Sequence, residues 1–194
     1  MIKALLLIFE PVRTWDNIAL KRRSLPYVLL LNVLPLLLVT GYAEWYSLVD
    51  WGRWRPLLEK VGAVSPHQAG CYVGGQFLLS LVVVFLTARI VQTVNQSFHG
   101  RSTFTEAFTL VAYALSPMFA LRFLDMLPKL NEWVSYLIGA LFMLATLYNG
   151  LPRMLKTDAP NAFGLYCLSV LIMAGITGIA RFCALALLEG KLPF

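Results

Sequence analysis

Five long apolar runs without a charged side chain constrain this chain more than any other feature. They cover residues 25–43, 69–88, 107–121, 133–152 and 159–180. An α-helix needs about 20 residues to cross a hydrocarbon core of about 30 Å. Four of the five runs reach 19 residues or more, and the third gains length from Phe123 and Leu124 beyond Arg122. The sequence therefore predicts an all-α, polytopic transmembrane helical bundle with spans at about 25–46, 69–94, 104–124, 133–151 and 160–188.

The composition leaves no room for a separate soluble domain beside these spans. Hydrophobic residues make up 59% of the 194 residues. The mean hydropathy of +0.71 is too high for a soluble domain of this size. We therefore expect a single membrane domain over residues 1–194. The formal net charge of +6 does not indicate nucleic acid as a partner, because the basic residues are spread over short loops and form no stripe interleaved with aromatic residues.

The distribution of basic residues predicts the orientation of the chain. With five spans, the N-terminal segment lies on the same side as the second and fourth loops, and that side carries nine Lys and Arg residues against five on the other. The nine are Lys3, Arg13, Lys21, Arg22, Arg23, Arg89, Arg101, Arg153 and Lys156, and the five are Arg53, Arg55, Lys60, Lys129 and Lys191. The positive-inside rule then places the N-terminus in the cytoplasm and the C-terminus outside.

Residues 1–24 are predicted to form a cytoplasmic segment that lies in the membrane interface. Apolar and charged residues are mixed from 1 to 20 in an amphipathic pattern, which Pro11 interrupts. The alternative is a frayed polar tail. Lys21, Arg22 and Arg23 directly precede the first span, where each would attract anionic lipid headgroups by about 1 kcal/mol. Their contribution to orientation alone would explain the cluster equally well.

Capping sequences and prolines mark the helices. Residues 65–68 and 103–106 both fit the capping box, in which a hydroxyl accepts from a backbone amide and a Gln or Glu reaches back. Pro35 and Pro117 lie within spans, where each removes a backbone donor and is expected to kink its helix. In the long loop at 44–68, the spacing predicts a short helix in the outer interface, with one face formed by Leu48, Trp51, Leu58 and Val61.

Ionisable residues at membrane depth are costly and are therefore the first candidates for a site. Near the cytoplasmic face, Arg89 and Glu106 are predicted to pair. Near the outer end of the third span, Arg122 and Asp125 stand one helical turn apart and could pair along the helix. Arg181 interrupts the fifth span, and Asp125 is its most plausible acidic partner. Arg122, Asp125 and Arg181 thus define either a structural charge cluster or an intramembrane site for a substrate or lipid headgroup.

Signatures of an enzyme are absent from the sequence. His67 and His99 are predicted in loops on opposite faces of the membrane, so they cannot bind a metal together, and no HExxH, GxSxG or pair of intramembrane aspartates is present. We therefore expect no catalytic residues, no metal and no cofactor. A transporter would need a polar path, for which the spans offer Asn32, Gln76, Gln92, Asn95 and Asn149, but no inverted repeat is evident.

Three segments together resemble the bacterial branch of the Yip1 domain family, and the resemblance covers nearly the whole chain. They are FEPVRTWDNI at 9–18, STFTEAFTLVAYALSP at 102–117 and LYNGLPRML at 147–155. The shared features are a short cytoplasmic N-terminal segment, five spans, Tyr113 and Pro117 in the third span, and a Tyr-x-Gly-Leu-Pro exit from the fourth span that contains Gly150 and Pro152.

The resemblance implies an integral membrane protein with its N-terminus inside and its C-terminus outside, and it implies no catalytic residues. Eukaryotic relatives are tied to vesicle traffic and to small GTPases of the Rab class through longer N-terminal regions. The residues of the motif have local physical reasons. Pro117 would kink the third span, the hydroxyl of Tyr113 would bond a carbonyl freed by that kink, and the segment from Gly150 to Pro152 would end the fourth span.

The sequence thus favours a non-enzymatic protein that organises, scaffolds or regulates a bacterial cytoplasmic (inner) membrane. Its expected partners are membrane lipids, together with a membrane-protein partner or a second copy of the chain. The competing hypothesis is a small transporter or lipid-translocating protein with Arg122, Asp125 and Arg181 around a polar cavity in the outer half of the bundle.

Overall fold

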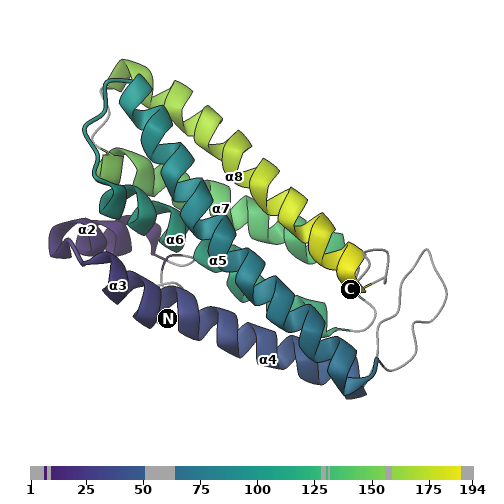
Figure 1. Ribbon diagram of the computed structural model, residues 1–194. Coiled ribbons are helices and arrows are strands. Elements are labelled where there is room, and N and C mark those ends of the chain that lie inside the picture. The colour runs from purple at the N-terminus through teal and green to yellow at the C-terminus, as the bar shows by residue number, and fades with distance from the viewer. Residues whose placement is uncertain are drawn as a thin grey trace.

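A computed structural model describes residues 7, 10–50, 64–127, 130, 132–155 and 159–188. Within these residues the fold is all-helical and has no strand. The elements in chain order are α2 (Pro11–Lys21), α3 (Leu25–Val28), the π-helical turn η1 (Leu29–Val33), α4 (Leu34–Asp50), α5 (Pro66–Ser97), α6 (Phe104–Leu121), the 3₁₀ turn η2 (Arg122–Met126), α7 (Glu132–Leu155) and α8 (Ala159–Leu188) (Figure 1).

In the described part of the chain, five helical stretches are long and apolar enough to cross a membrane. They are Leu25–Asp50, Pro66–Ser97, Phe104–Met126, Trp133–Leu155 and Asn161–Ala186. This confirms the predicted all-α bundle with five spans. Of the interfacial helix predicted in the 44–68 loop, Trp51, Leu58 and Val61 lie outside the described residues. Leu48 belongs instead to α4 and is buried against Ala69 and Tyr72 of α5.

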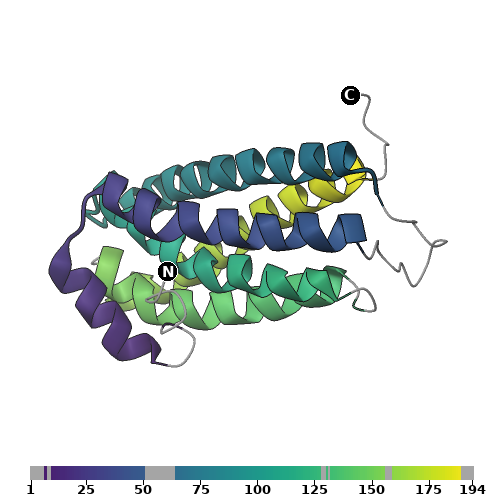
Figure 2. The ribbon, with the colours of Figure 1, turned by 90° about the horizontal axis from the view of Figure 1, so that it is seen from below.

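The spans alternate in direction, which gives the bundle two distinct ends (Figures 1 and 2). The end that carries α2 also holds the 98–103 connection and the start of α8, and we call it the α2 end. The other end holds η2, the last turns of α4 and the C-terminal part of α8, and we call it the η2 end. The predicted orientation would place the α2 end in the cytoplasm.

Helix α6 forms the centre of the bundle. Every residue from 107 to 119 is buried, and 72% of the most apolar window of this span is inside, against 22% for the span that contains α8. Both groups of the predicted capping box are present at its start, because Thr103 accepts from the Glu106 amide and Glu106 accepts from the Thr103 amide. Helix α8 is therefore the most peripheral span.

Pro35 has a clear local effect on the first span. The Leu34 amide donates to the Leu29 carbonyl, five residues earlier, so the turn before Pro35 is π-helical. The wider turn makes room for the proline ring, which in an α-helix would clash with the preceding turn. Within η1, Asn32 is buried and donates to Ser116 Oγ of α6 at 2.9 Å. The predicted distortion thus places a polar contact between the first and third spans.

Helix α2 lies across one end of the bundle (Figure 2). Residues 11–21 therefore form a helix and not the frayed tail that was the alternative. Pro11 stands at its first position, where the missing N–H costs nothing, and Glu10 directly before it is not helical. Trp15 is fully buried, donates from its indole nitrogen to the Thr146 carbonyl at 2.9 Å, and packs edge-on against Tyr113. Gly150 makes this possible, because a Cβ there would lie 2.4 Å from the indole.

Candidate functional site

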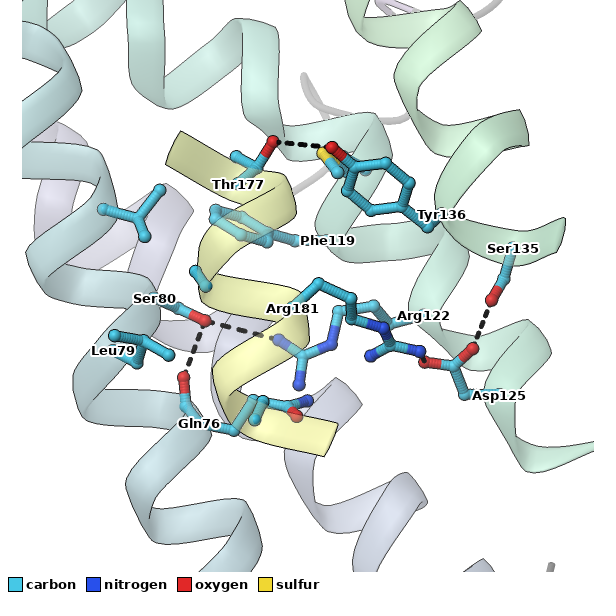
Figure 3. A pocket seen from close by; sticks show the side chains of 14 residues that line it. Gln76, Leu79, Ser80, Phe119, Arg122, Asp125, Ser135, Tyr136, Thr177 and Arg181 are labelled. Atoms are coloured by element: carbon cyan, nitrogen blue, oxygen red, sulfur yellow. Dashed lines mark hydrogen bonds and ion pairs between the residues drawn. The ribbon is translucent and has the colours of Figure 1, made fainter. Parts of the chain in front are cut away.

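Two buried ion pairs lie together at the η2 end. Figure 3 shows Arg122, Asp125 and Arg181 of these pairs. Arg122 Nη2 is 3.0 Å from Glu44 Oε2, and Arg181 Nη2 is 2.6 Å from Asp125 Oδ2. The side chains of both acids are at most 1% exposed, and those of the arginines 14% and 8%. The pairs join α4 to η2 and η2 to α8. Two positive and two negative charges therefore balance at membrane depth.

The structure brings Asp125 and Arg181 together, but it gives Arg122 a partner that the sequence analysis did not name. Its spacing along the helix allowed Arg122 to pair with Asp125, but its guanidinium reaches Glu44 on the first span. The physical reason is that Glu44 is buried and requires a cation, while Asp125 already accepts from Arg181 and from Ser135 Oγ at the start of α7.

The described contacts of Glu44 include three donors from two elements, α5 and η2. Tyr72 Oη donates to its Oε1 at 3.1 Å, and Gln76 Nε2 and Arg122 Nη2 donate to its Oε2 at 2.7 and 3.0 Å. Arg122 Nη1 also reaches Ser80 Oγ at 3.4 Å. The carboxylate thereby fixes α4, α5 and η2 relative to one another.

A periodic signal for Glu44 exists in the sequence. Thr40, Glu44 and Leu48 are spaced by four residues, and all three are at most 1% exposed. Glu44 lies where the first predicted span, 25–46, meets the predicted 44–68 loop, and it was not among the predicted site residues. Two buried arginines in one half of a bundle also require two acids, which points to Glu44 beside Asp125.

A cavity of about 60 Å³ lies beside the ion pairs. Gln76, Ser80, Arg122, Asp125 and Arg181 contribute polar atoms to its wall (Figure 3). Much of the remaining wall is apolar and comes from α5, α6 and α8, through Leu79, Val83, Met118, Phe119, Ala180 and Ala184. Among the buried polar atoms in residues of this wall, Gln76 Oε1 and Arg122 Nε have no hydrogen-bond partner. Residues of the cavity wall therefore offer an acceptor at Gln76 and a donor at Arg122.

The predicted lipid-contacting residues lie at the α2 end, and two of them, Arg22 and Arg23, line a second cavity of about 660 Å³. Arg22, Arg23 and Arg153 line it together with Asp16 and Glu106. Arg153 Nε pairs with Asp16 Oδ1 at 2.6 Å, which ties α7 to α2. Lys21 is exposed in the last turn of α2. Three arginines from two distant parts of the chain thus border one space at this end.

The conformation of Arg22 helps to form this basic group. Its φ of 31° lies in the left-handed region, where it ends α2. Arg23 follows directly, and its guanidinium lies 3.9 Å from the centre of the Tyr27 ring. The turn between α2 and α3 therefore holds the two arginines on a defined backbone.

Arg89 and Glu106, which were predicted to pair near the cytoplasmic face, have separate hydrogen-bond partners. Arg89 Nη1 donates to Gln92 Oε1 within α5 at 2.8 Å. Glu106 Oε2 accepts from the backbone amide and the hydroxyl of Thr103 at 2.9 and 3.1 Å. The described contacts of both residues are thus local.

The expectation that the segment from Gly150 to Pro152 ends the fourth span was wrong. Helix α7 continues to Leu155 with Pro152 inside it. The reason is that a proline removes a single hydrogen bond, while Arg153 Nη1 donates to the Asn149 carbonyl at 2.6 Å and packing on α2 holds the turn. Pro117 also lies inside its helix, α6. Tyr113 contributes its ring to the Trp15 contact, and the described contacts include no hydrogen bond from its hydroxyl to a freed carbonyl.

The fold and its apolar surface define an integral membrane protein with five helical spans. Its large exposed side chains, such as Leu38, Leu78, Leu141, Leu171 and Phe182, are apolar and lie on the spans. Among the described residues, no group of three or more His, Cys, Asp or Glu could hold a metal ion.

A family model described as the Yip1 domain matches residues 5–181, which is nearly the whole chain. The chain therefore belongs to the Yip1 domain family. Searches of curated proteins and of solved structures found no match.

Proposed function

We propose that this protein is a non-enzymatic membrane-organising protein that acts by binding anionic lipids at its α2 end. The observation that carries the proposal is the convergence of Arg22, Arg23 and Arg153 on one cavity beside α2. Family membership supports an integral membrane protein, and the cavity supplies a place for lipid contact.

The structure of α2 suits a lipid-facing role. Its inner face is fixed to the bundle by Trp15 and by the pair of Asp16 with Arg153. Its other face leaves Leu20 81% exposed beside Lys21 and Arg22. An apolar residue next to basic residues at a membrane surface combines insertion with attraction to anionic headgroups.

The magnitude is large enough to measure. At about 1 kcal/mol per basic residue, Arg22 and Arg23 together contribute about 2 kcal/mol, which is roughly a 30-fold change in affinity for an anionic lipid. Such a difference would bias which lipids surround the protein.

The test compares two double variants with equal loss of charge. Arg22→Gln with Arg23→Gln should weaken binding of phosphatidylglycerol, measured by native mass spectrometry of delipidated protein, by roughly 30-fold. Arg13→Gln with Arg101→Gln is the control, because both residues are exposed and neither lines the cavity. Equal weakening by the two variants would overturn the proposal. Labelling of the exposed Cys71 with an impermeant thiol reagent reports whether either variant has changed orientation.

A second candidate is a small transporter or lipid-translocating protein with its site at the η2 end. The observation in its favour is the cavity with a free donor and a free acceptor at Arg122 and Gln76. It predicts that reconstituted protein moves a labelled lipid between leaflets and that Arg181→Leu stops this while folding is retained. Loss of folded protein in the same variant favours a structural role for the ion pair.

A further inference from the structure

The cavity at the η2 end has a chemical asymmetry that indicates what it binds. One polar atom beside it can only accept a hydrogen bond and another can only donate one, and both lack a partner. These atoms belong to Gln76 and Arg122, which lie on different elements and line the same space (Figure 3). A buried polar atom without a partner costs about 1–3 kcal/mol, so an occupant that satisfies both is favoured.

The identity of the free acceptor follows from the Glu44 carboxylate. Gln76 is 4% exposed, and its Nε2 donates to Glu44 Oε2 at 2.7 Å. Because a carboxylate only accepts, the nitrogen of the amide must be the atom that faces it. The oxygen is therefore the atom left for an occupant of the cavity, and the occupant must offer an N–H or O–H.

The free donor follows in the same way. Arg122 uses Nη2 on Glu44 and Nη1 on Ser80, and its buried Nε–H has no partner. An arginine Nε–H is best satisfied by an anionic oxygen such as that of a phosphate. The occupant therefore needs an acidic acceptor as well as a donor.

Charge balance narrows the class of the occupant. Glu44 and Asp125 cancel Arg122 and Arg181, so the site has no net charge to offer a purely anionic or cationic ligand. A zwitterion matches this arrangement, with its phosphate toward Arg122 and its ammonium toward Gln76. Apolar side chains such as Val83, Met118 and Phe119 complete the wall, which suits a ligand that is part of an amphiphile.

We propose that this cavity binds the headgroup of a zwitterionic phospholipid with a primary amine. Phosphatidylethanolamine has the N–H donors that Gln76 requires, whereas phosphatidylcholine has a quaternary ammonium without N–H. Phosphatidylglycerol has hydroxyl donors, but its net negative charge finds no excess of positive charge here. The site is at the opposite end of the bundle from the basic group of the proposed function and stands independently of it.

The test is a lipid titration of delipidated protein in mild detergent, followed by native mass spectrometry. The probes are phosphatidylethanolamine, phosphatidylcholine and phosphatidylglycerol with identical acyl chains. Phosphatidylethanolamine should bind at least about tenfold more tightly than phosphatidylcholine, the worth of one charge-assisted hydrogen bond. Soluble glycerophosphoethanolamine, which carries the same headgroup, should bind much more weakly if the natural source is a membrane lipid.

Two matched variants distinguish an effect of the cavity itself from an effect of losing a donor to Glu44. Gln76→Met keeps the volume but removes the free acceptor, and it should abolish the preference for phosphatidylethanolamine over phosphatidylcholine. Tyr72→Phe also removes one donor to Glu44 but does not line the cavity, so the preference should persist. Arg22→Gln with Arg23→Gln should leave this preference unchanged even where it weakens phosphatidylglycerol binding.

Several outcomes would overturn the proposal. Equal binding of the ethanolamine and choline lipids by the unchanged protein would show that the site does not recognise an N–H of the headgroup. This comparison does not depend on whether any variant folds. Tightest binding of phosphatidylglycerol, retained when Arg22 and Arg23 are replaced, would make the η2 cavity an anion site. Equal affinity for soluble glycerophosphoethanolamine would make the ligand aqueous, and binding of none of the probes would leave water as the occupant.

Discussion

The ion pair between Asp125 and Arg181 provides the sharpest test of how this bundle is held together. Their side chains are 0% and 8% exposed and their charged atoms are 2.6 Å apart. Replacing Arg181 with Leu leaves a buried carboxylate whose cation is gone. Removing one partner of a buried pair costs about 3–5 kcal/mol. For a chain of this size that corresponds to a fall in melting temperature on the order of 10 °C.

The double variant separates the interaction energy of the ion pair from the effect of replacing each residue. Asp125→Leu with Arg181→Leu removes both charges, and replacing a buried pair by apolar residues is often neutral or stabilising. We expect each single variant to lose folded yield and the double variant to recover it. The coupling energy between the two sites should be at least about 3 kcal/mol, as obtained from a double-mutant cycle.

The assay is thermal unfolding in mild detergent, followed by the fraction that remains monodisperse on size-exclusion chromatography. Arg89→Leu is the control, because Arg89 is exposed and its described bond is local, and it should change stability by less than about 0.5 kcal/mol. If the double variant loses as much stability as the two single variants combined, the pair is not coupled and the reasoning fails.

Three further predictions concern the contacts between α2 and α7. Gly150→Ala should destabilise the protein by about 1–3 kcal/mol, since its Cβ would lie 2.4 Å from the Trp15 ring, and a change in tryptophan fluorescence should accompany the lower melting temperature. Trp15→Phe should cost more than the roughly 1 kcal/mol of its bond to the Thr146 carbonyl, because volume is lost as well, and limited proteolysis should then cut near α2. Asp16→Asn should lower stability by less than about 1 kcal/mol, since that side chain is 55% exposed in its pair with Arg153, and high salt should reduce the difference further.

The sequence is most informative about the spans and least informative about contacts between them. Charge-free runs predict the five spans because a helix in the hydrocarbon core must be apolar along its length. This requirement acts on each residue and can therefore be read from the sequence. Asp125 and Arg181 could be matched because each is a costly charge in the same half. Glu44 was missed because its burial depends on α4 continuing to Asp50, which no charge-free run reveals.

Close contacts between helices could not be predicted from the sequence because they depend on how the helices are placed. Gly150 was interpreted as a helix end, whereas its role is to admit the Trp15 ring. The same three residues of a Gly-x-Pro segment suit a terminus or a close approach, and only the position of α2 decides between them. The amphipathic pattern predicted that α2 lies at an interface, but it could not indicate that Trp15 faces α7.

Helix α8 illustrates why polar contacts decide the arrangement of a peripheral span. Between membrane helices the lipid is as apolar as leucine, so burial alone gives little drive for association, and packing and hydrogen bonds must supply it. On α8, Arg181 pairs with Asp125, and the Ala174 carbonyl accepts from Tyr136 Oη at 2.9 Å. Tyr136 also lines the η2 cavity.

Tyr136→Phe should therefore loosen α8 without disturbing the rest of the bundle. The expected cost is about 0.6–2 kcal/mol, the range for interhelical hydrogen bonds in membranes. Hydrogen exchange in detergent should become faster for amides of α8 near Ala174 and stay unchanged for α6, whose residues 107–119 are all buried. Faster exchange throughout α6 would mean that α8 is not an independent peripheral span and that the bundle opens as one unit.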